Sequence, residues 1–462
     1  MRPGRGRVPG PGGGGMTFIF LMLYQLYRVV SWWWGWLLRR FTPAGLAVLG
    51  GLVISMGMGL DTDNNSMYQA FPLLLGLVLV AMAFCGPFRP RLAVTRLLPR
   101  FGTAGCPMHY KVRVRNLGAG PETGLGLLEV LVDSRPTFRE WRTAQIDTNR
   151  QSRSFRVSQH RRMNPFKTAK VGNAVVPGLA PSEEVEVQVE VTPLRRGVLR
   201  FRSLVFARPD PLGLFRALRE MPLPQTALIL PRRYRVPLVA LPGTLKYQEG
   251  GVAMASSVGQ SDEFVSLRDY RHGDPMRHIH WRSWARAGRP VVKEFEDEFF
   301  VRHALVLDTF GDYVNVDVFE EAVSVAASFA CSVATQESLL DLLFVGTKSY
   351  CFTAGRGLAH ADQMLEILAA VQLCRDSSFQ DLERLVLDHT AAVSGCICVL
   401  VAWDGPRRDF VGKMVRLGVP LLVLLVVPPG TPVPDAGPMR QCPGQFHVLV
   451  AGRIQEGLAV IR

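Results

Sequence analysis

The sequence predicts a multidomain α+β membrane protein with an N-terminal transmembrane helical hairpin, an antiparallel β-sandwich and a C-terminal α/β domain. Three observations lead to this prediction: two uncharged apolar runs near the N-terminus, strict apolar–polar alternation in the middle of the chain, and continuous apolar strands separated by helices in the last third. At 462 residues, the chain is long enough for about three domains. Its eight cysteines include no Cys-x-x-Cys pair, which argues against a zinc ribbon or a disulfide scaffold and favours a reducing compartment.

Positive charge is concentrated beside the apolar runs. Lys and Arg total 53 against 39 Asp and Glu, a net charge of +14, and residues 1–100 carry ten Arg, two Asp and no Lys. Arginines next to apolar segments favour a lipid bilayer over nucleic acid, because anionic headgroups attract them. We therefore expect a membrane lipid bilayer as a partner and no nucleic acid.

The first 100 residues divide into a tail and a membrane segment. Residues 1–15 are Gly, Pro and Arg with almost nothing to bury, so we expect a disordered tail. Within the membrane segment 16–100, the stretch 17–38 holds four Trp but is interrupted by Arg28. This pattern predicts an amphipathic helix lying in the membrane interface, with a third span as the alternative.

The two uncharged runs are Phe41–Leu60 and Asn64–Phe88. Because about 20 apolar residues cross a bilayer, they predict transmembrane helices over 41–60 and 68–88. The short loop between them has no Lys or Arg, whereas arginines lie on both outer sides. The positive-inside rule then places both outer ends, and all later domains, in the cytoplasm as parts of a multi-pass plasma-membrane protein.

The rest of the chain changes pattern twice. Residues 101–221 contain strictly alternating segments, such as 110–116 and 185–191, and predict an antiparallel β-sandwich. Residues 222–302 form a connector with many charged and aromatic residues. Residues 303–462 predict a parallel sheet covered by helices on both faces.

The elements of this α/β domain follow from apolar runs and helical periodicity. We expect strands over 304–307, 339–345, 396–401 and 421–427, and helices over 318–333, 361–373 and 409–417.

The connector holds the densest polar group of the chain, with five Arg, four acidic residues and three His over residues 262–286. The sequence Gly273-Asp274-Pro275 predicts a turn. Asp274 is expected to cap the helical turn that follows, with Arg277 reaching back to it, and Trp281 and Trp284 are expected to share one face.

Three interpretations of the connector stay open. The first is an Arg–carboxylate network that joins the sandwich to the α/β domain. The second is a partner-binding surface built on the same residues, and the third is a catalytic or metal site. The metal interpretation would use His272, His278 and His280, for which no further ligand is evident.

Two acidic residues follow strands of the α/β domain. Asp308 and Asp404 lie where parallel sheets bind ligands, so they are the metal-site candidates, with Thr353 and Asp312 as further oxygen donors. The alternative is that both acids cap the helices after them. The chain has no phosphate-binding loop, no Gly-x-Ser-x-Gly elbow and no His-Glu-x-x-His, so the sequence predicts neither an enzyme nor a cofactor.

The connector resembles the signature of the bacterial domain of unknown function (DUF) 58 family. The matching positions are Arg268, Tyr270, Gly273, Asp274, Arg277, Ile279, Trp281, Ala285, Arg286 and Glu294. Upstream, Arg196-Gly197 and Asp210-Pro211-Leu212-Gly213-Leu214-Phe215 look like two further family segments, and the hairpin with Asn64-Asn65 looks like the family's two-helix anchor.

This resemblance implies a membrane-anchored bacterial protein whose C-terminal domain is von Willebrand factor A-like, a Rossmann-like α/β fold. It implies a scaffold or adaptor role beside MoxR-type AAA+ ATPases and other von Willebrand A proteins. The metal site of such domains reads Asp-x-Ser-x-Ser, whereas this chain has Asp308-Thr309-Phe310-Gly311-Asp312, so both Ser are replaced.

The sequence therefore leaves three functions open. The first is a membrane-tethered module for protein–protein interactions in the assembly or maturation of other complexes. The second is a metal-dependent hydrolase or binding protein with a degenerate adhesion-type metal site. The third is an envelope protein that organises lipids through its basic N-terminal segment.

Overall fold

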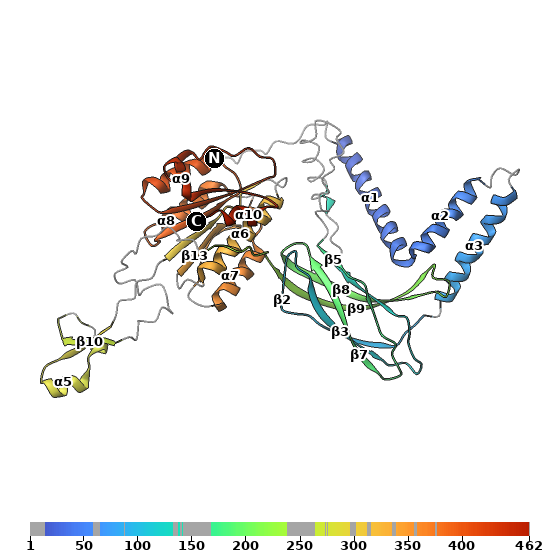
Figure 1. The fold of residues 1–462 in the computed structure, drawn as a ribbon, viewed down its shortest axis with the longest axis horizontal. Helices are drawn as coiled ribbons and strands as arrows, with labels where there is room; N and C mark the ends of the chain where they lie inside the picture. Colours follow the sequence, from blue (N-terminus) through green and yellow to red (C-terminus); the bar gives the residue numbers. More distant parts are fainter. Residues whose placement is uncertain are drawn as a thin grey trace, which may run out of the picture. The chain divides into compact units, whose positions relative to one another are not determined.

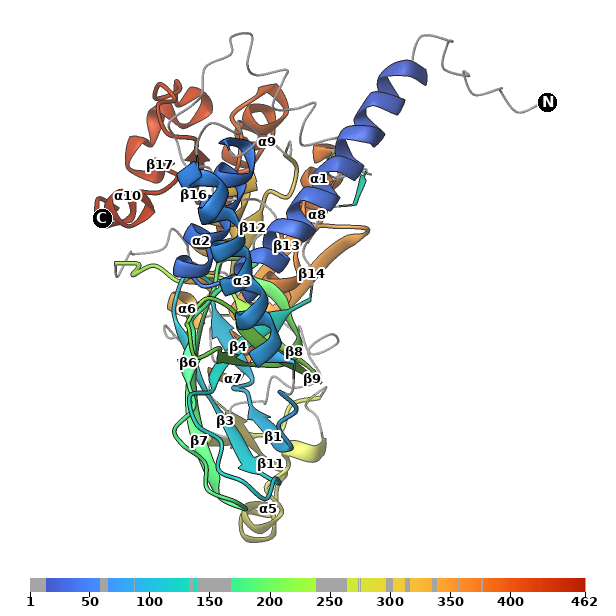
Figure 2. The ribbon, with the colours of Figure 1, turned by 90° about the vertical axis from the view of Figure 1, so that its right-hand side faces the viewer.

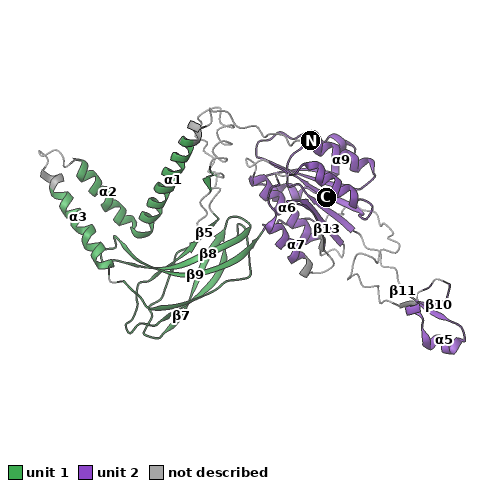
Figure 3. Cartoon of the chain, turned by 180° about the vertical axis from the view of Figure 1, so that it is seen from behind, with its two compact units in different colours: residues 1–230 green, residues 231–462 purple. Residues whose placement is uncertain are grey.

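The computed structural model describes residues 14–58, 65–86, 88–132, 137–138, 141, 168–237, 264–272, 274, 276–295, 302–311, 316–334, 339–354, 358–374 and 377–461. The chain forms two compact units, Met1–Leu230 and Pro231–Arg462 (Figure 3). The predicted tail over residues 1–15 falls almost wholly outside the described residues.

The N-terminal unit begins with three helices, α1 (Gly14–Arg40), α2 (Pro43–Met58) and α3 (Asn65–Cys85). The predicted transmembrane hairpin is wrong: among the residues that the structure describes, no helix combines the length and the apolarity that a membrane crossing needs. Helix α2 has 16 residues, about 24 Å of helix against a hydrocarbon layer of roughly 30 Å. Helix α3 becomes continuously apolar only after Gln69 and contains Pro72.

The same finding overturns the expected multi-pass localisation in the bacterial plasma membrane, because that expectation depended on spans over 41–60 and 68–88. The helix expected over 17–38 is present within α1, and Trp32, Trp33 and Trp34 are exposed on it. Its position in a membrane interface stays a prediction, which flotation of the full chain with anionic and neutral vesicles would test.

Two sheets follow the helices and share one hydrophobic core. Strands β1 (Leu92–Leu97), β3 (Met108–Asn116), β7 (Glu184–Pro193) and β5 (Ala169–Val171) form the first sheet, in that order. The second has the order β2 (Phe101–Thr103), β9 (Arg216–Leu230), β8 (Gly197–Pro209), β4 (Gly126–Leu131) and β6 (Ala174–Val175) (Figure 2). The alternation predicted over 110–116 is visible in β3, where buried and exposed residues alternate along the whole strand.

The helical segment is fastened to the second sheet at the corner between α1 and α2, where the chain reverses direction (Figure 1). Phe41 forms an isolated β-bridge with Phe215, and the two rings lie edge to face with their centroids 4.9 Å apart. Thr42 donates its backbone N–H to the carbonyl of Leu214 at 3.1 Å and its hydroxyl to the carbonyl of Gly213 at 2.5 Å. A Cβ atom on Gly45 would lie 2.0 Å from the Leu214 carbonyl oxygen, so only glycine permits this close approach.

The second unit contains a hairpin module, which we define as residues 264–295. Strands β10 (Phe264–Asp269) and β11 (Val291–Phe295) pair antiparallel. The segment between them contains the 3₁₀ turn η1 (Met276–His278) and the short helix α5 (Trp281–Ala287). The sequence predicted this region as a connector and gave no strand pairing within it.

The remainder of the second unit is a six-stranded α/β sheet with the order β14-β13-β12-β15-β16-β17. Its strands are β12 (Arg302–Leu307), β13 (Leu339–Val345), β14 (Ser349–Ala354), β15 (Gly395–Leu400), β16 (Leu421–Val427) and β17 (Phe446–Val450). All pairings are parallel except that of β13 with β14. Counted along the chain this order is 3-2-1-4-5-6, that of a doubly wound sheet, and its topological switch point lies between β12 and β15.

Helices cover both faces of this sheet (Figure 1). One face carries α6 (Val316–Ala334) and α7 (Leu358–Ala370), and the other carries α8 (Phe379–His389) and α9 (Gly405–Arg416). The C-terminal segment adds η3 (Gly437–Gln441), η4 (Pro443–Gln445) and α10 (Ile454–Ala459). The continuous apolar strands predicted from the sequence are buried along their length, as β15 and β16 illustrate.

Candidate functional site

The turn of the hairpin module is held by a two-pronged ion pair. Arg268, on β10, places Nη1 2.7 Å and Nη2 2.8 Å from the two carboxylate oxygens of Asp274. The backbone N–H of Arg271 donates to the same carboxylate at 2.8 Å. These interactions lower the pKa of Asp274 to about 2, the Arg268 hydrogen bonds first and the Arg271 N–H second. Arg277 was the expected partner of Asp274, but in the structure this partner is Arg268.

Backbone contacts fix the helical part of the module to β11. Ile279 is buried and forms an isolated β-bridge with Val292, and the N–H of His280 donates to the carbonyl of Val291 at 2.8 Å. Helix α5 ends at Ala287 and is capped by Gly288, which has a φ of 68° and donates its N–H to the carbonyl of Trp284. The module therefore presents α5 from a defined position on its own hairpin.

Two tryptophans and several cations lie on the surface of the module. Trp281 and Trp284 stack with ring centroids 5.2 Å apart and an interplanar angle of 17°, as expected from their spacing. Trp281 is 65% exposed and Met276 75% exposed. The module contains seven Arg and Lys against three acidic residues. The exposed cations include Arg271, Arg277, Arg282, Arg286 and Arg289.

The other connector residues expected to belong to the site are Tyr270, Glu294, Gly273 and the three histidines. Tyr270 is half-buried and donates its backbone N–H to the carbonyl of Pro290 at 3.0 Å. Glu294 lies on β11 opposite Ser266. Gly273 lies outside the described residues. The connector histidines do not assemble a metal site with other ligands, since the described part of the chain has no group of three or more His, Cys, Asp or Glu side chains that could hold an ion.

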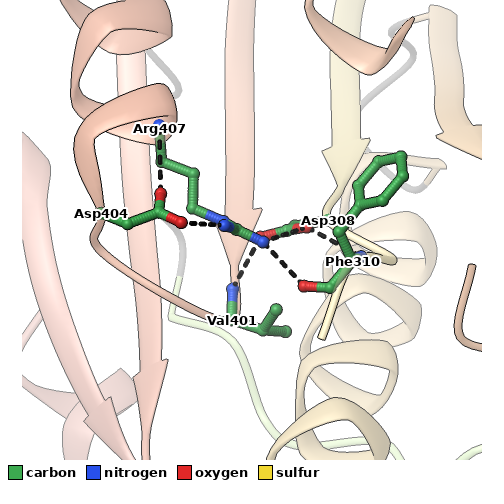
Figure 4. Close-up of polar contacts among 5 residues, drawn as sticks. All are labelled: Asp308, Phe310, Val401, Asp404 and Arg407. Atoms are coloured by element: carbon green, nitrogen blue, oxygen red, sulfur yellow. Dashed lines mark hydrogen bonds and ion pairs between the residues drawn. The ribbon is translucent and has the colours of Figure 1, made fainter. Parts of the chain in front are cut away.

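A second polar cluster lies at the switch point of the α/β sheet, where Asp308 follows β12 and Asp404 precedes α9 (Figure 4). Arg407, on the first turn of α9, reaches between them. Its Nε and Nη2 donate to the two oxygens of Asp308 at 2.6 and 3.1 Å, and its Nη1 donates to Asp404 at 2.6 Å. Asp308 is fully buried and Arg407 nearly so, whereas half of the Asp404 side chain is exposed.

The electrostatics of this cluster follow from its burial. Burial raises the pKa of the Asp308 carboxyl, and the charge and hydrogen bonds of Arg407 oppose that rise. Burial alone would lower the pKa of Arg407, but the charges of Asp308 and Asp404 raise it above its usual value. The three side chains form one ion-pair network, which we call the Arg407 cluster.

The structure also corrects the expected set of oxygen donors. Asp404 caps α9 by accepting the N–H of Arg407, as the capping alternative expected. Thr353 lies away from Asp308 and instead donates to Asp341, which pairs with Arg302 at the opposite end of β12. Asp312 lies outside the described residues. Arg407 was not among the residues expected at this site, although an Arg three residues after an N-cap Asp has a recognisable spacing for an ion pair.

Comparison with known families supports the resemblance drawn from the connector residues. Residues 266–392 match the family model described as "Protein of unknown function DUF58". This stretch includes most of the hairpin module and continues through β12 and α8.

A bacterial relative is similar to part of this chain. It is the "Uncharacterized protein YeaD" of Bacillus subtilis (strain 168), which is 30% identical over 182 residues. The match covers 39% of this chain and 44% of YeaD, so the chain spans less than half the length of this relative.

Solved structures give only distant similarity. The crystal structure of the CARDB domain of the PF1109 protein from Pyrococcus furiosus, a complex with di-metal ions, is 14% identical. It covers 30% of this chain and 89% of its own, with a TM-score of 0.17. A GH20 exo β-N-acetylglucosaminidase from Vibrio harveyi is 10% identical, covers 73% of this chain and 57% of its own, and has a TM-score of 0.12. These TM-scores are too low to carry an argument about fold or function.

Proposed function

We propose that this protein is a scaffold or adaptor that works by binding a protein partner, and that the hairpin module is its binding element. One observation carries the proposal: the module exposes Trp281, stacked on the half-buried Trp284, beside a series of arginines on a small platform with its own fixed geometry. Trp and Arg are the residue types that most often dominate the free energy of protein–protein binding.

The fixed geometry supports this role. The Arg268–Asp274 pair holds the turn, and the contacts of Ile279 and His280 with β11 hold the start of α5. A side chain held in place before binding loses less conformational entropy when the complex forms. The module therefore combines large contact groups with little freedom to be lost.

The charge of the module indicates the chemistry of the partner. Seven cationic side chains against three acidic ones give residues 264–295 a net charge of +4. Such a surface complements an acidic surface that carries an apolar pocket for Trp281. The resemblance to the DUF58 family makes a MoxR-type AAA+ ATPase the expected partner, with other von Willebrand A proteins as further candidates and the assembly or maturation of other complexes as the expected role.

Cross-linking in cells followed by affinity purification and mass spectrometry tests this proposal on the full chain. The bait is the wild type or Trp281→Ala, and Trp34→Ala is the control because Trp34, at 61%, is about as exposed but lies on α1. We expect an AAA+ ATPase with the wild type and with Trp34→Ala, and at least tenfold less of it with Trp281→Ala, as for a binding hot spot of about 2 kcal/mol.

The purified ATPase is then titrated with the purified chain at increasing salt concentration. Because the module is basic, we expect affinity to fall as salt screens the charges. Full recovery of the ATPase by a folded Trp281→Ala variant, or an affinity that does not depend on salt, would contradict the proposal.

A further inference from the structure

We infer that Arg407 is a built-in counter-cation that takes the place of a divalent metal ion at the switch point of the α/β sheet. Its removal should convert Asp308 and Asp404 into a metal site that the native protein lacks. The inference does not depend on the proposed partner-binding function, because it concerns a different part of the second unit.

The Arg407 cluster lies where sheets of this kind bind ligands. In doubly wound sheets, ligands bind outside the carboxyl ends of the strands at the switch point. Asp308 directly follows β12, and Asp404 lies beyond the end of the neighbouring strand β15. Two carboxylates at this place are the start of a site for Mg²⁺ or Mn²⁺, which prefer oxygen ligands.

Both carboxylate oxygens of Asp308 already accept hydrogen bonds. One oxygen accepts the N–H of Phe310 at 3.0 Å and Nη2 of Arg407 at 3.1 Å. The other accepts the N–H of Val401 at 3.2 Å and Nε of Arg407 at 2.6 Å (Figure 4). A carboxylate offers about four acceptor positions, so this set of donors leaves no lone pair of Asp308 for a metal ion.

Arg407 is likewise held by several acceptors. Besides the two carboxylates, its guanidinium donates to the carbonyl of Phe310 at 2.7 Å and lies 4.9 Å from the ring centroid of Phe379. Four of its five N–H bonds thus have acceptors. A divalent ion entering this place would have to displace a nearly buried, fully charged side chain.

The described oxygen donors at this place are too few for a divalent metal ion. A hard divalent cation takes about six or more oxygen ligands. The hydroxyl of Thr309, the residue after Asp308, could in principle bind a metal ion. It is fully buried, however, and donates to the carbonyl of Val345 at 2.5 Å. The residues present therefore do not fit a metal ion, but they fit a guanidinium, whose fork matches a carboxylate in two-pronged geometry.

The test counts bound Mn²⁺ on the full chain by electron paramagnetic resonance, in which free Mn²⁺ gives a six-line signal. Wild type and Asp404→Asn are compared at millimolar Mn²⁺, and we expect equal counts. Arg407→Ser frees both carboxylates and the Phe310 carbonyl and adds a hydroxyl. We expect it to bind about one more Mn²⁺ per chain than wild type, as the oxygen donors it releases begin a coordination shell. The extra ion should be lost in the double variant Arg407→Ser, Asp404→Asn.

Two results would overturn the inference. One is a wild-type chain that binds one Mn²⁺ more than Asp404→Asn, which would show that the native site already takes a metal. The other is a folded Arg407→Ser variant that binds no additional ion. If Arg407→Ser unfolds, the comparison of wild type with Asp404→Asn still decides, because Asp404 is half exposed and its replacement leaves the Arg407–Asp308 pair intact.

Discussion

Glu129, Asp308 and Asp341 have fully buried side chains, and each of these carboxylates is paired with an arginine. Glu129 pairs with Arg96 in the sandwich core, and Asp308 and Asp341 pair with Arg407 and Arg302 in the α/β domain. In the first of these clusters the hydroxyl of Tyr110 also donates to Glu129, at 2.6 Å. Removing one partner of a buried ion pair is costly, because the other charge stays buried without compensation.

The substitution Glu129→Ala should lower the free energy of unfolding of the sandwich by about 3–5 kcal/mol, since Arg96 then lacks its buried partner. Glu186→Ala is the matched control: Glu186 also lies on a sandwich strand and pairs with Lys111 and Arg113, but all three side chains are exposed. We expect a much smaller effect there, because solvent screens that network. Urea unfolding of both variants measures the difference, and equal losses would contradict the argument.

The ion pair of the hairpin module predicts a pH dependence. The pKa of Asp274 falls from an ordinary value of 3.8 to about 2 on folding. The folded state therefore binds the proton less tightly, so the pair stabilises the module above about pH 4 and loses this contribution as the pH falls toward 2. Carboxyl ¹³C NMR should show a midpoint near pH 2 for Asp274 and a higher midpoint in Arg268→Gln. A midpoint near 3.8 in the wild type would contradict the pairing.

For single residues, the sequence predicted local features of the candidate sites correctly but not the side chains with which the charged residues form ion pairs. The turn around Asp274 and the common face of Trp281 and Trp284 were predicted from spacing alone. The partner of Asp274 is Arg268, six residues earlier on β10, because the chain turns back at Arg271 directly after this strand. The expectation of Arg277 assumed helical spacing after Asp274, and that spacing does not describe this turn. Arg407 was missed because its main partner, Asp308, is 99 residues away in the chain.

At the scale of elements, the start of α2 is docked on the turn that joins β8 to β9. In that turn, Asp210 accepts the N–H groups of Leu212, Leu214 and Phe215, which shapes it for the contacts with Thr42 and Gly45. The approach at Gly45 is closer than any side chain allows.

Gly45→Ala should therefore separate α2 from this turn, with a destabilisation of about 1–3 kcal/mol from overpacking. Gly50→Ala, on the same helix, is the control, because its new Cβ would meet nothing within 4 Å. That control should be neutral or stabilising by up to about 1 kcal/mol, since alanine favours helix. Hydrogen exchange at the Thr42 amide, which bonds Leu214, measures the docking. Equal protection in the two variants would show that the contact at Gly45 does not hold the helix.

Strands and helices were predicted well where the apolar pattern of the sequence matches the buried faces in the structure, and poorly elsewhere. The strand expected over 421–427 coincides with β16, and the helix over 318–333 lies within α6, because burial on both faces or on one stripe imposes a clear periodicity. The prediction of a transmembrane helix over 41–60 was wrong for two reasons that hydropathy does not show. Phe41 and Thr42 bind the sandwich, and α2 ends at Met58. Strand β14 was missed because it is a partly exposed edge strand.

At the scale of the whole molecule, each unit has its own hydrophobic core. The sandwich core is built from residues before 230, and the core that includes α8 and α9 is built from residues after 303. Because cores hold most of the stabilising free energy, we expect the two units to unfold in separate steps.

Differential scanning calorimetry of full-length variants tests this expectation. Phe410 is fully buried on α9, so Phe410→Ala should cost about 3–5 kcal/mol and lower the melting temperature of one transition only. Glu129→Ala should lower the other transition and leave the first unchanged. A single transition that moves in both variants would mean that the two units unfold as one.

The attachment of the α2–α3 pair has a mechanical consequence. At one end, Phe41 and Thr42 join the chain to the turn between β8 and β9, and at the other, Phe88 is part of the sandwich core just before β1 begins. A force applied to the far tips of these helices is therefore borne by two anchors on different sheets. Because the helix pair is attached at both ends, we expect such a force to reach the sandwich as a torque, and we do not expect the pair to swing about a single attachment.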